Sequence, residues 1–118
     1  MIDQHNYYLE KLLNNLSVVN EDPKSIEWIF SEPSLFHKGS FAKKKLCDIL
    51  LGYYDKSRVV IEVKRSPQGR EKAIEQLTNG AYLLNTFGYS VKRSKIVYYC
   101  KKCFEFEEVR INGQIQNS

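Results

Sequence analysis

Apolar residues recur at steps of three and four in two stretches of the chain, the spacing of a helix that buries one face. The first stretch predicts a helix over roughly Asp3 to Val19, and the second predicts one from about Gln68 to Thr86 that Gly88 is placed to end. The apolar stripe of the first helix consists of Leu9, Leu12, Leu13, Leu16 and Val19. Both helices are amphipathic, so we expect each to cover another apolar surface.

Short runs rich in β-branched, aromatic and other apolar residues predict the strands. The runs are Ile26 to Phe30, Leu46 to Tyr54, Arg58 to Arg65, Lys95 to Cys100 and Phe104 to Ile111. Pro33 and Gly39 favour a loop over Ser31 to Ser40, and Asn112-Gly113 suits a type I′ turn after the last strand. The order helix, strand, hairpin, helix, strand, strand predicts an α/β sandwich in which helices flank a central mixed sheet.

The 118 residues, 42% of them apolar, predict a single domain over positions 1–118. No run approaches the roughly 18 consecutive apolar residues of a membrane span, and Met1 to Asn6 lacks the order of a signal peptide. We therefore expect a cytoplasmic protein of a prokaryote or a virus, with no membrane partner. Three cysteines, an odd number, favour free thiols over a disulfide scaffold.

The net charge of +4 is mild, but the basic residues cluster. The clusters are Lys43 to Lys45, Lys64 with Arg65, Lys92 with Arg93, and Lys101 with Lys102. They suit a phosphate backbone and are equally ordinary on a solvated surface, so charge alone leaves a nucleic-acid partner open. Cys100 and Cys103 have the spacing of half a zinc site and are expected in a turn between two strands; we expect no zinc, because a closed site needs four ligands.

Charged residues interrupt the otherwise apolar strands of the predicted hairpin. Side chains alternate between the faces of a strand, so Glu62 and Lys64 project together from one face. Asp48 lies on the preceding strand. If Asp55 to Ser57 form a three-residue loop, Asp48 stands opposite Lys64 and on the face of Glu62, whereas a two-residue loop would put Asp48 on the other face.

Two carboxylates beside a lysine in covered strands need a partner, and a hard divalent cation is the usual one. Mg²⁺ is the expected metal, with Mn²⁺ able to substitute. Such an ion polarises a phosphodiester and positions a water, while Lys64 stabilises the developing charge. Alternating charges also occur on solvated sheet faces, and spacing alone leaves that interpretation open. The continuous apolar runs around Asp48 and Glu62 favour the metal site.

The segment from Lys38 to Tyr99 resembles the PD-(D/E)xK nuclease superfamily. The resemblance rests on Asp48-Ile49-Leu50, on Ile61-Glu62-Val63-Lys64, and on the helix that holds Glu75-Gln76-Leu77. It implies a restriction-endonuclease-like sandwich, metal ligation by Asp48, Glu62 and the Val63 carbonyl, catalysis by Lys64, and Gln76 near the site. Cys47 stands where the first letter of the motif has proline.

Small Holliday-junction resolvases are the members of the superfamily that the chain resembles most. They place a further metal-binding glutamate on the first helix, for which Glu10 is the candidate and Asn6 the substitute. The loop with Gly39 is similar to one of their substrate-contacting segments. The nucleic-acid contacts that this resemblance and the basic clusters imply are Lys38, Ser40, Lys43, Lys44, Lys45 and Arg65.

The prediction for function is therefore a Mg²⁺-dependent endodeoxyribonuclease, structure-specific in the manner of a junction resolvase and working on DNA as a homodimer. Two alternatives stay open at this point. One is a catalytically silent nucleic-acid-binding or assembly module on the same fold. The other is a nicking or exonuclease-like domain that works with larger partners. The sequence leaves open whether DNA or RNA is cut.

Overall fold

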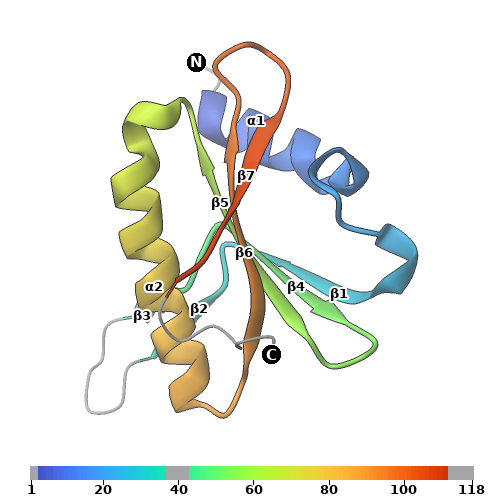
Figure 1. The fold of residues 1–118 in the computed structure, drawn as a ribbon, viewed down its shortest axis with the longest axis vertical. Helices are drawn as coiled ribbons and strands as arrows, with labels where there is room; N and C mark the ends of the chain where they lie inside the picture. Colours follow the sequence, from blue (N-terminus) through green and yellow to red (C-terminus); the bar gives the residue numbers. More distant parts are fainter. Residues whose placement is uncertain (1–2, 37–42, 112–118) are drawn as a thin grey trace.

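The structure is a computed structural model that describes residues 3–36 and 43–111 (Figure 1). Its regular elements follow the predicted order of helices and strands. They are α1 (Gln4–Leu13), the 3₁₀ turns η1 (Leu16–Val19) and η2 (Pro23–Ser25), β1 (Ile26–Ser31), β2 (Ser34–Phe36), β3 (Lys43–Lys45), β4 (Ile49–Tyr53), β5 (Arg58–Lys64), η3 (Pro67–Gly69), α2 (Arg70–Thr86), β6 (Val91–Tyr98) and β7 (Glu105–Val109).

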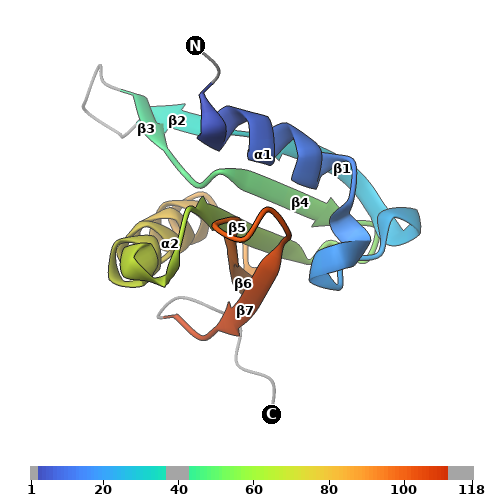
Figure 2. The same cartoon turned by 90° about the horizontal axis from the view of Figure 1, so that it is seen from above.

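Five strands form one mixed sheet in the order β1-β4-β5-β6-β7, with β5 and β6 parallel and the other neighbours antiparallel. The helix α2 makes the crossover between the two parallel strands and covers one face through Leu77 and Ala81. The helix α1 covers the other face through Leu9 and Leu12 (Figures 1 and 2). The α/β class, the mixed central sheet and the flanking helices are thus confirmed.

The first helix is shorter than its apolar stripe predicts, because it ends at Leu13. The side-chain amides of Asn14 and Asn15 donate to the carbonyls of Glu10 and Lys11, at 3.1 and 2.8 Å, and so take up helix acceptors. The chain then turns into η1, where Leu16 and Val19 remain buried. The predicted single helix to Val19 is wrong, although the buried stripe that suggested it is real.

A second departure lies in the predicted loop over Ser31 to Ser40. Within it Ser34–Phe36 forms strand β2, which pairs antiparallel with Lys43–Lys45 of β3 in a separate two-stranded sheet. The local composition of the two segments does not predict that they pair with one another. Positions 37–42 lie outside the described residues, as do Asn112, Gly113, Gln114 and Ile115 of the predicted last turn.

The β4–β5 hairpin keeps the predicted face but not the predicted register. The ladder pairs Gly52 with Arg58 and Ile49 with Ile61, so facing positions sum to an even number, as expected, but two lower than predicted. The turn keeps three residues but lies one position earlier than predicted, because the Tyr53 N–H donates to the Ser57 carbonyl at 2.9 Å. Within it the Lys56 N–H donates to the Tyr53 carbonyl at 3.0 Å, and Lys56 adopts a left-handed φ of 74°. Asp48 therefore does not stand opposite Lys64, and it falls beside Glu62 instead.

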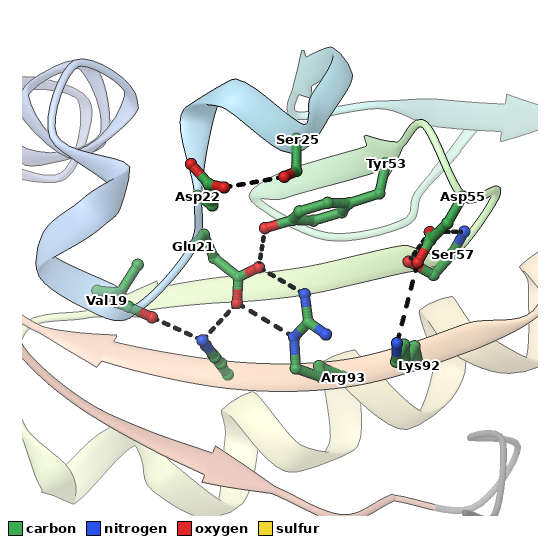
Figure 3. A network of polar contacts seen from close by, with 10 residues as sticks. Val19, Glu21, Asp22, Ser25, Tyr53, Asp55, Ser57, Lys92 and Arg93 are labelled. Atoms are coloured by element: carbon green, nitrogen blue, oxygen red, sulfur yellow. Dashed lines mark hydrogen bonds and ion pairs between the residues drawn. The ribbon is translucent and has the colours of Figure 1, made fainter.

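A buried ion network ties the segment after α1 to the sheet (Figure 3). Glu21, only 1% exposed, accepts a hydrogen bond at 2.8 Å from Nη2 of Arg93 and forms an ion pair with Lys95 on the same strand. The hydroxyl of Tyr53 donates to the same carboxylate, and the Lys95 ammonium also donates to the Val19 carbonyl at 2.6 Å. Burial acts to raise the pKa of Glu21, but these contacts outweigh it, and the pKa lies below the ordinary 4.5.

We expect Glu21→Gln to lower the free energy of unfolding at neutral pH by about 3–5 kcal/mol, because it leaves Lys95 as an uncompensated buried charge. The carboxylate has a depressed pKa in the folded state, so its stabilisation is present above pH 4.5 and is lost as the pH falls through the folded value. Urea titrations over this range should show a shallower pH dependence in the variant. Exposed Glu27→Gln is the control, and equal pH slopes in Glu21→Gln and wild type would contradict this role.

Candidate active site

Two buried carboxyl groups meet where β4 begins and β5 nears its end. Asp48 and Glu62 are each 1% exposed, and their carboxyl groups are hydrogen-bonded to one another. Two hydrogen bonds fix the backbone of Asp48. Its N–H donates to the Ile61 carbonyl at 3.2 Å, and its carbonyl accepts from the Glu32 N–H at 2.7 Å. The strand ends therefore hold the two acids in one place.

Val63 adds backbone groups to this pair. Its N–H donates to Asp48 Oδ2 at 2.8 Å. The N–H and C=O of one strand residue point toward the same neighbouring strand, so the Val63 carbonyl faces the same side as Asp48. Two carboxyl groups and a carbonyl oxygen thus come from Asp48, Glu62 and Val63, as the resemblance implies.

The two acids cannot both ionise cheaply at this separation. Burial, the charge of Asp48 and the hydrogen bond that the Glu62 carboxyl donates to Asp48 raise the pKa of Glu62 to about 9. Burial also acts to raise the pKa of Asp48, but the hydrogen bonds from Glu62, Lys45 and the Val63 amide hold it below its ordinary value. At neutral pH the pair consists of an ionised Asp48 and a protonated Glu62. A cation bound between them would take the place of that proton.

Lys45 supplies the nearest positive charge. Its ammonium forms an ion pair with Asp48 Oδ1 and lies 3.7 Å from Glu32 Oε1, while 42% of its side chain remains exposed. Burial acts to lower the pKa of Lys45, but Asp48 and its other acidic neighbours raise it on balance. Sequence analysis placed Lys45 only among nucleic-acid contacts, and the structure brings it to the carboxyl pair itself.

The first helix contributes His5 to the site rather than Glu10. His5 Nε2 lies 3.4 Å from Asp48 Oδ2. Glu10 is exposed, about 140° around the helix from His5, and Asn6 is also exposed. Sequence analysis missed His5, although it stands four residues before Leu9 on the same helical stripe, a spacing that marks the buried face.

A cavity of about 440 Å³ opens beside Glu62, between β5 and α2. It is lined by Lys45, Leu46, Glu62, Gln76, Asn79, Tyr82 and Leu83. Gln76 is one of the lining residues, and its side-chain oxygen is buried and accepts no hydrogen bond within the described part of the chain. A buried acceptor with no donor is costly, and a rotation of this side chain toward the cavity would let a ligand or water supply one.

The other predicted site residues do not all lie beside the carboxyl pair. The half-buried Lys64 shares the face of Glu62, runs beside Gly69, and its charge acts to lower the pKa of Glu62. Arg65 points to the opposite face, where it lines a separate cavity of about 140 Å³ with Tyr8 and Tyr99. The backbones of Lys43 and Lys44 lie in β3, whereas Lys38 and Ser40 fall outside the described residues.

The donor set suits a hard cation held mostly by water. Among residues 3–36 and 43–111, no three side chains of the His, Cys, Asp and Glu types gather in a way that could hold a metal ion. Mg²⁺ does not require three, because it keeps several waters and binds through one or two carboxylates plus substrate phosphates. Asp48, Glu62 and the Val63 carbonyl fit that ion, whereas a structural zinc ion has a different donor set. Cys47 is buried, which raises the pKa of its thiol well above the ordinary 9.0.

Comparison with protein-family models, with curated proteins and with solved structures finds no match to this chain. Within the described residues, no helix has the length and apolar character to cross a membrane. All three cysteines are free, as expected, and Cys100 and Cys103 lie in the turn between β6 and β7. The interpretation of the site therefore depends on its own geometry and on the sequence motif.

We expect Gly80→Ala to destabilise the protein by about 1–3 kcal/mol, the usual cost of overpacking. A Cβ at Gly80 would stand 2.0 Å from the carbonyl oxygen of Leu46, two residues before Asp48, so α2 must shift to accept it. Alanine normally stabilises a helix interior relative to glycine, so a loss of stability reports this close approach. Denaturant titration gives the free energy, and the NMR shifts of the His5 ring report displacement of Asp48. Exposed Glu75→Ala on α2 is the control; a Gly80 variant as stable as wild type would refute the constraint.

Proposed function

We propose that the protein is a metal-dependent nuclease of the PD-(D/E)xK type that hydrolyses DNA phosphodiester bonds. The observation that carries the proposal is the buried pair of Asp48 and Glu62 at the end of two strands, with Glu62 held neutral, beside a cavity that Gln76 lines. A mixed sheet with a helix on each face and an active site at its strand ends supports the restriction-endonuclease-like assignment. Burying two acids together has no structural benefit unless their charge is used.

The residues take distinct parts in this reaction. Asp48, Glu62 and the Val63 carbonyl would hold Mg²⁺, or Mn²⁺ in its place. The ion, when bound, polarises the phosphodiester and makes a bound water more acidic. Lys64 supplies positive charge for the phosphate oxygens as negative charge develops on them. Gln76 lines the cavity beside Glu62, where its side-chain amide would orient the attacking water once it turns toward the cavity.

Lys45 and His5 both contact Asp48, one of the proposed metal ligands. Lys45 neutralises Asp48 before a cation arrives, and its exposed ammonium is then available to a backbone phosphate. His5 contacts one oxygen of Asp48 and limits how that carboxylate can turn. DNA as substrate, a junction-like structure preference and action as a homodimer are implied by the family resemblance alone, and we include them in the proposal together with the expected cytoplasmic setting.

One observation favours the alternative of a catalytically silent binding module. The ion pair between Lys45 and Asp48 satisfies the ionised acid without any metal. A module that only binds nucleic acid could keep such a pair for stability. The unpaired oxygen of Gln76 weighs against this alternative, because a purely structural cluster would satisfy it.

We expect Glu62→Gln to reduce DNA cleavage by a factor of at least about 100, the cost of losing one essential electrostatic contact. The thermal midpoint should not fall, because the raised pKa of Glu62, about 9, already makes it a neutral hydrogen-bonding group at neutral pH. Cleavage of labelled four-way junction, duplex and single-stranded DNA is measured with Mg²⁺, Mn²⁺ or EDTA. Exposed Glu75→Gln on α2 is the matched control. If wild type cuts none of these substrates yet binds them, the silent module stands and the nuclease does not.

We expect His5→Ala to lower the cleavage rate roughly 10- to 100-fold, as is usual when a group that orients a metal ligand is removed. Glu10→Ala on the same helix should cut DNA at the wild-type rate, because Glu10 is exposed and faces away. Rates are compared under single-turnover conditions across a series of Mg²⁺ concentrations. A larger loss in Glu10→Ala than in His5→Ala would restore Glu10 as the ligand from the first helix.

A further inference from the structure

A second cavity, of about 540 Å³, lies on the α2 face of the sheet next to the active site. Leu46 lines both cavities, so the two adjoin. The side chains that shape this second cavity, here called the aromatic groove, are Trp28, Phe30, Leu50, Arg58 and Tyr89. They come from β1, β4, β5 and the loop after α2, and none of the described lining residues is acidic.

Three aromatic rings and one guanidinium plane form the walls of the aromatic groove. The guanidinium carbon of Arg58 lies 4.3 Å from the ring centroid of Tyr89 and 5.8 Å from that of Trp28. The Trp28 and Phe30 rings lie 4.9 Å apart. Phe30 is 53% exposed and Tyr89 is 45% exposed, so ring surface remains open to a ligand. Single exposed rings are ordinary, but contiguous ones beside a cation mark a binding surface.

The backbone is shaped to hold one of these rings flat. A Cβ at Gly52 would stand 2.2 Å from the Trp28 indole, so only glycine lets the ring lie against β4. The Arg58 guanidinium is fixed as well, since its Nη1 donates to the Lys56 carbonyl at 2.7 Å. The groove is therefore pre-organised, and a ligand that stacks in it loses little entropy in ordering the protein.

We propose that the aromatic groove binds unpaired nucleobases of the DNA strand that enters the active site, an inference that rests on the proposed function and names its substrate class. Aromatic and guanidinium planes stack on any base, which gives affinity for single strands without sequence preference. Arg58 and Glu62 are four residues apart on β5, roughly 13 Å. About four stacked nucleotides, at roughly 3.4 Å each, cover that distance. The preferred substrate is DNA with a single-stranded segment within a few nucleotides of the bond that is cut.

The chain contains one tryptophan, Trp28, so its fluorescence reports directly on the aromatic groove. The test is a titration with an oligothymidylate of about 12 nucleotides, a length within the site sizes of single-strand binders. It is run in EDTA so that no strand is cut. An abasic oligomer of equal length has the same phosphates without bases, and a duplex has its bases paired. We expect the oligothymidylate to quench Trp28 and to bind more tightly than the abasic oligomer, and the duplex to leave the emission unchanged.

Tyr89→Ala should weaken oligothymidylate binding roughly 5- to 100-fold, the cost of about one stacked base. Tyr54→Ala is the matched control, because Tyr54 is 63% exposed at the β4–β5 turn, outside the aromatic groove. Equal affinity for the abasic oligomer, or no effect of Tyr89→Ala, overturns the proposal. So does Trp28 emission that changes with protein concentration and not with oligothymidylate, because a second copy of the chain then occupies the groove.

The two proposals can fail separately. Base-dependent quenching in EDTA without cleavage in Mg²⁺ refutes the nuclease and leaves a nucleobase-binding groove. Cleavage without such quenching refutes the groove alone. Tyr89→Ala should also reduce cutting of a junction with unpaired nucleotides more than cutting of a fully paired duplex, since only the first presents free bases.

Discussion

The hydrogen bond between the carboxyl groups of Asp48 and Glu62 places two potential anions in one buried site. Only one of them can ionise without help, so the surrounding structure is arranged to favour one charge. The ammonium of Lys45, the amide of Val63 and the ring of His5 all contact Asp48. Ionised Asp48 and neutral Glu62 are the result, and β3, β5 and α1 each supply one of the groups that favour this state.

Among the described residues, the buried polar clusters around Glu21 and around Glu62 differ in how fully their hydrogen-bonding groups are satisfied. Around Glu21 every partner is present, with Arg93, Lys95 and Tyr53 all contacting one carboxylate, and the network fastens a connecting segment to the sheet. Around Glu62 a proton replaces a charge and the Gln76 oxygen lacks a donor among the described residues. The first cluster is complete as it stands and is structural. The second is incomplete, which supports the proposal that it binds a ligand.

Sequence analysis predicted the parts of this arrangement that depend on periodicity. Alternation along a strand put Asp48 and Glu62 on one face, and helical spacing placed α2 over them. The register of the hairpin was missed by two residues, because turn geometry around Lys56 decides it. Sequence analysis missed two further features, the contact of Lys45 with Asp48 and the pairing of β2 with β3. Both depend on tertiary structure, and local sequence patterns do not predict them. The position of His5 could have been predicted, because it lies on the helical stripe that marks the buried face of α1.

Lys45 gives the site an internal counter-ion, with consequences for when the protein can fold. A chain whose clustered acids depended on an external cation would be unfolded until that cation was supplied, as small zinc domains are. Here a flexible ammonium already balances the single charge on Asp48. If the site takes up a divalent ion as proposed, folding would not depend on that ion, and the protein would be fully folded when divalent ions are scarce. Under the proposed function, the ion would take the place of the Glu62 proton and of the Lys45 ammonium at Asp48, without a change of fold.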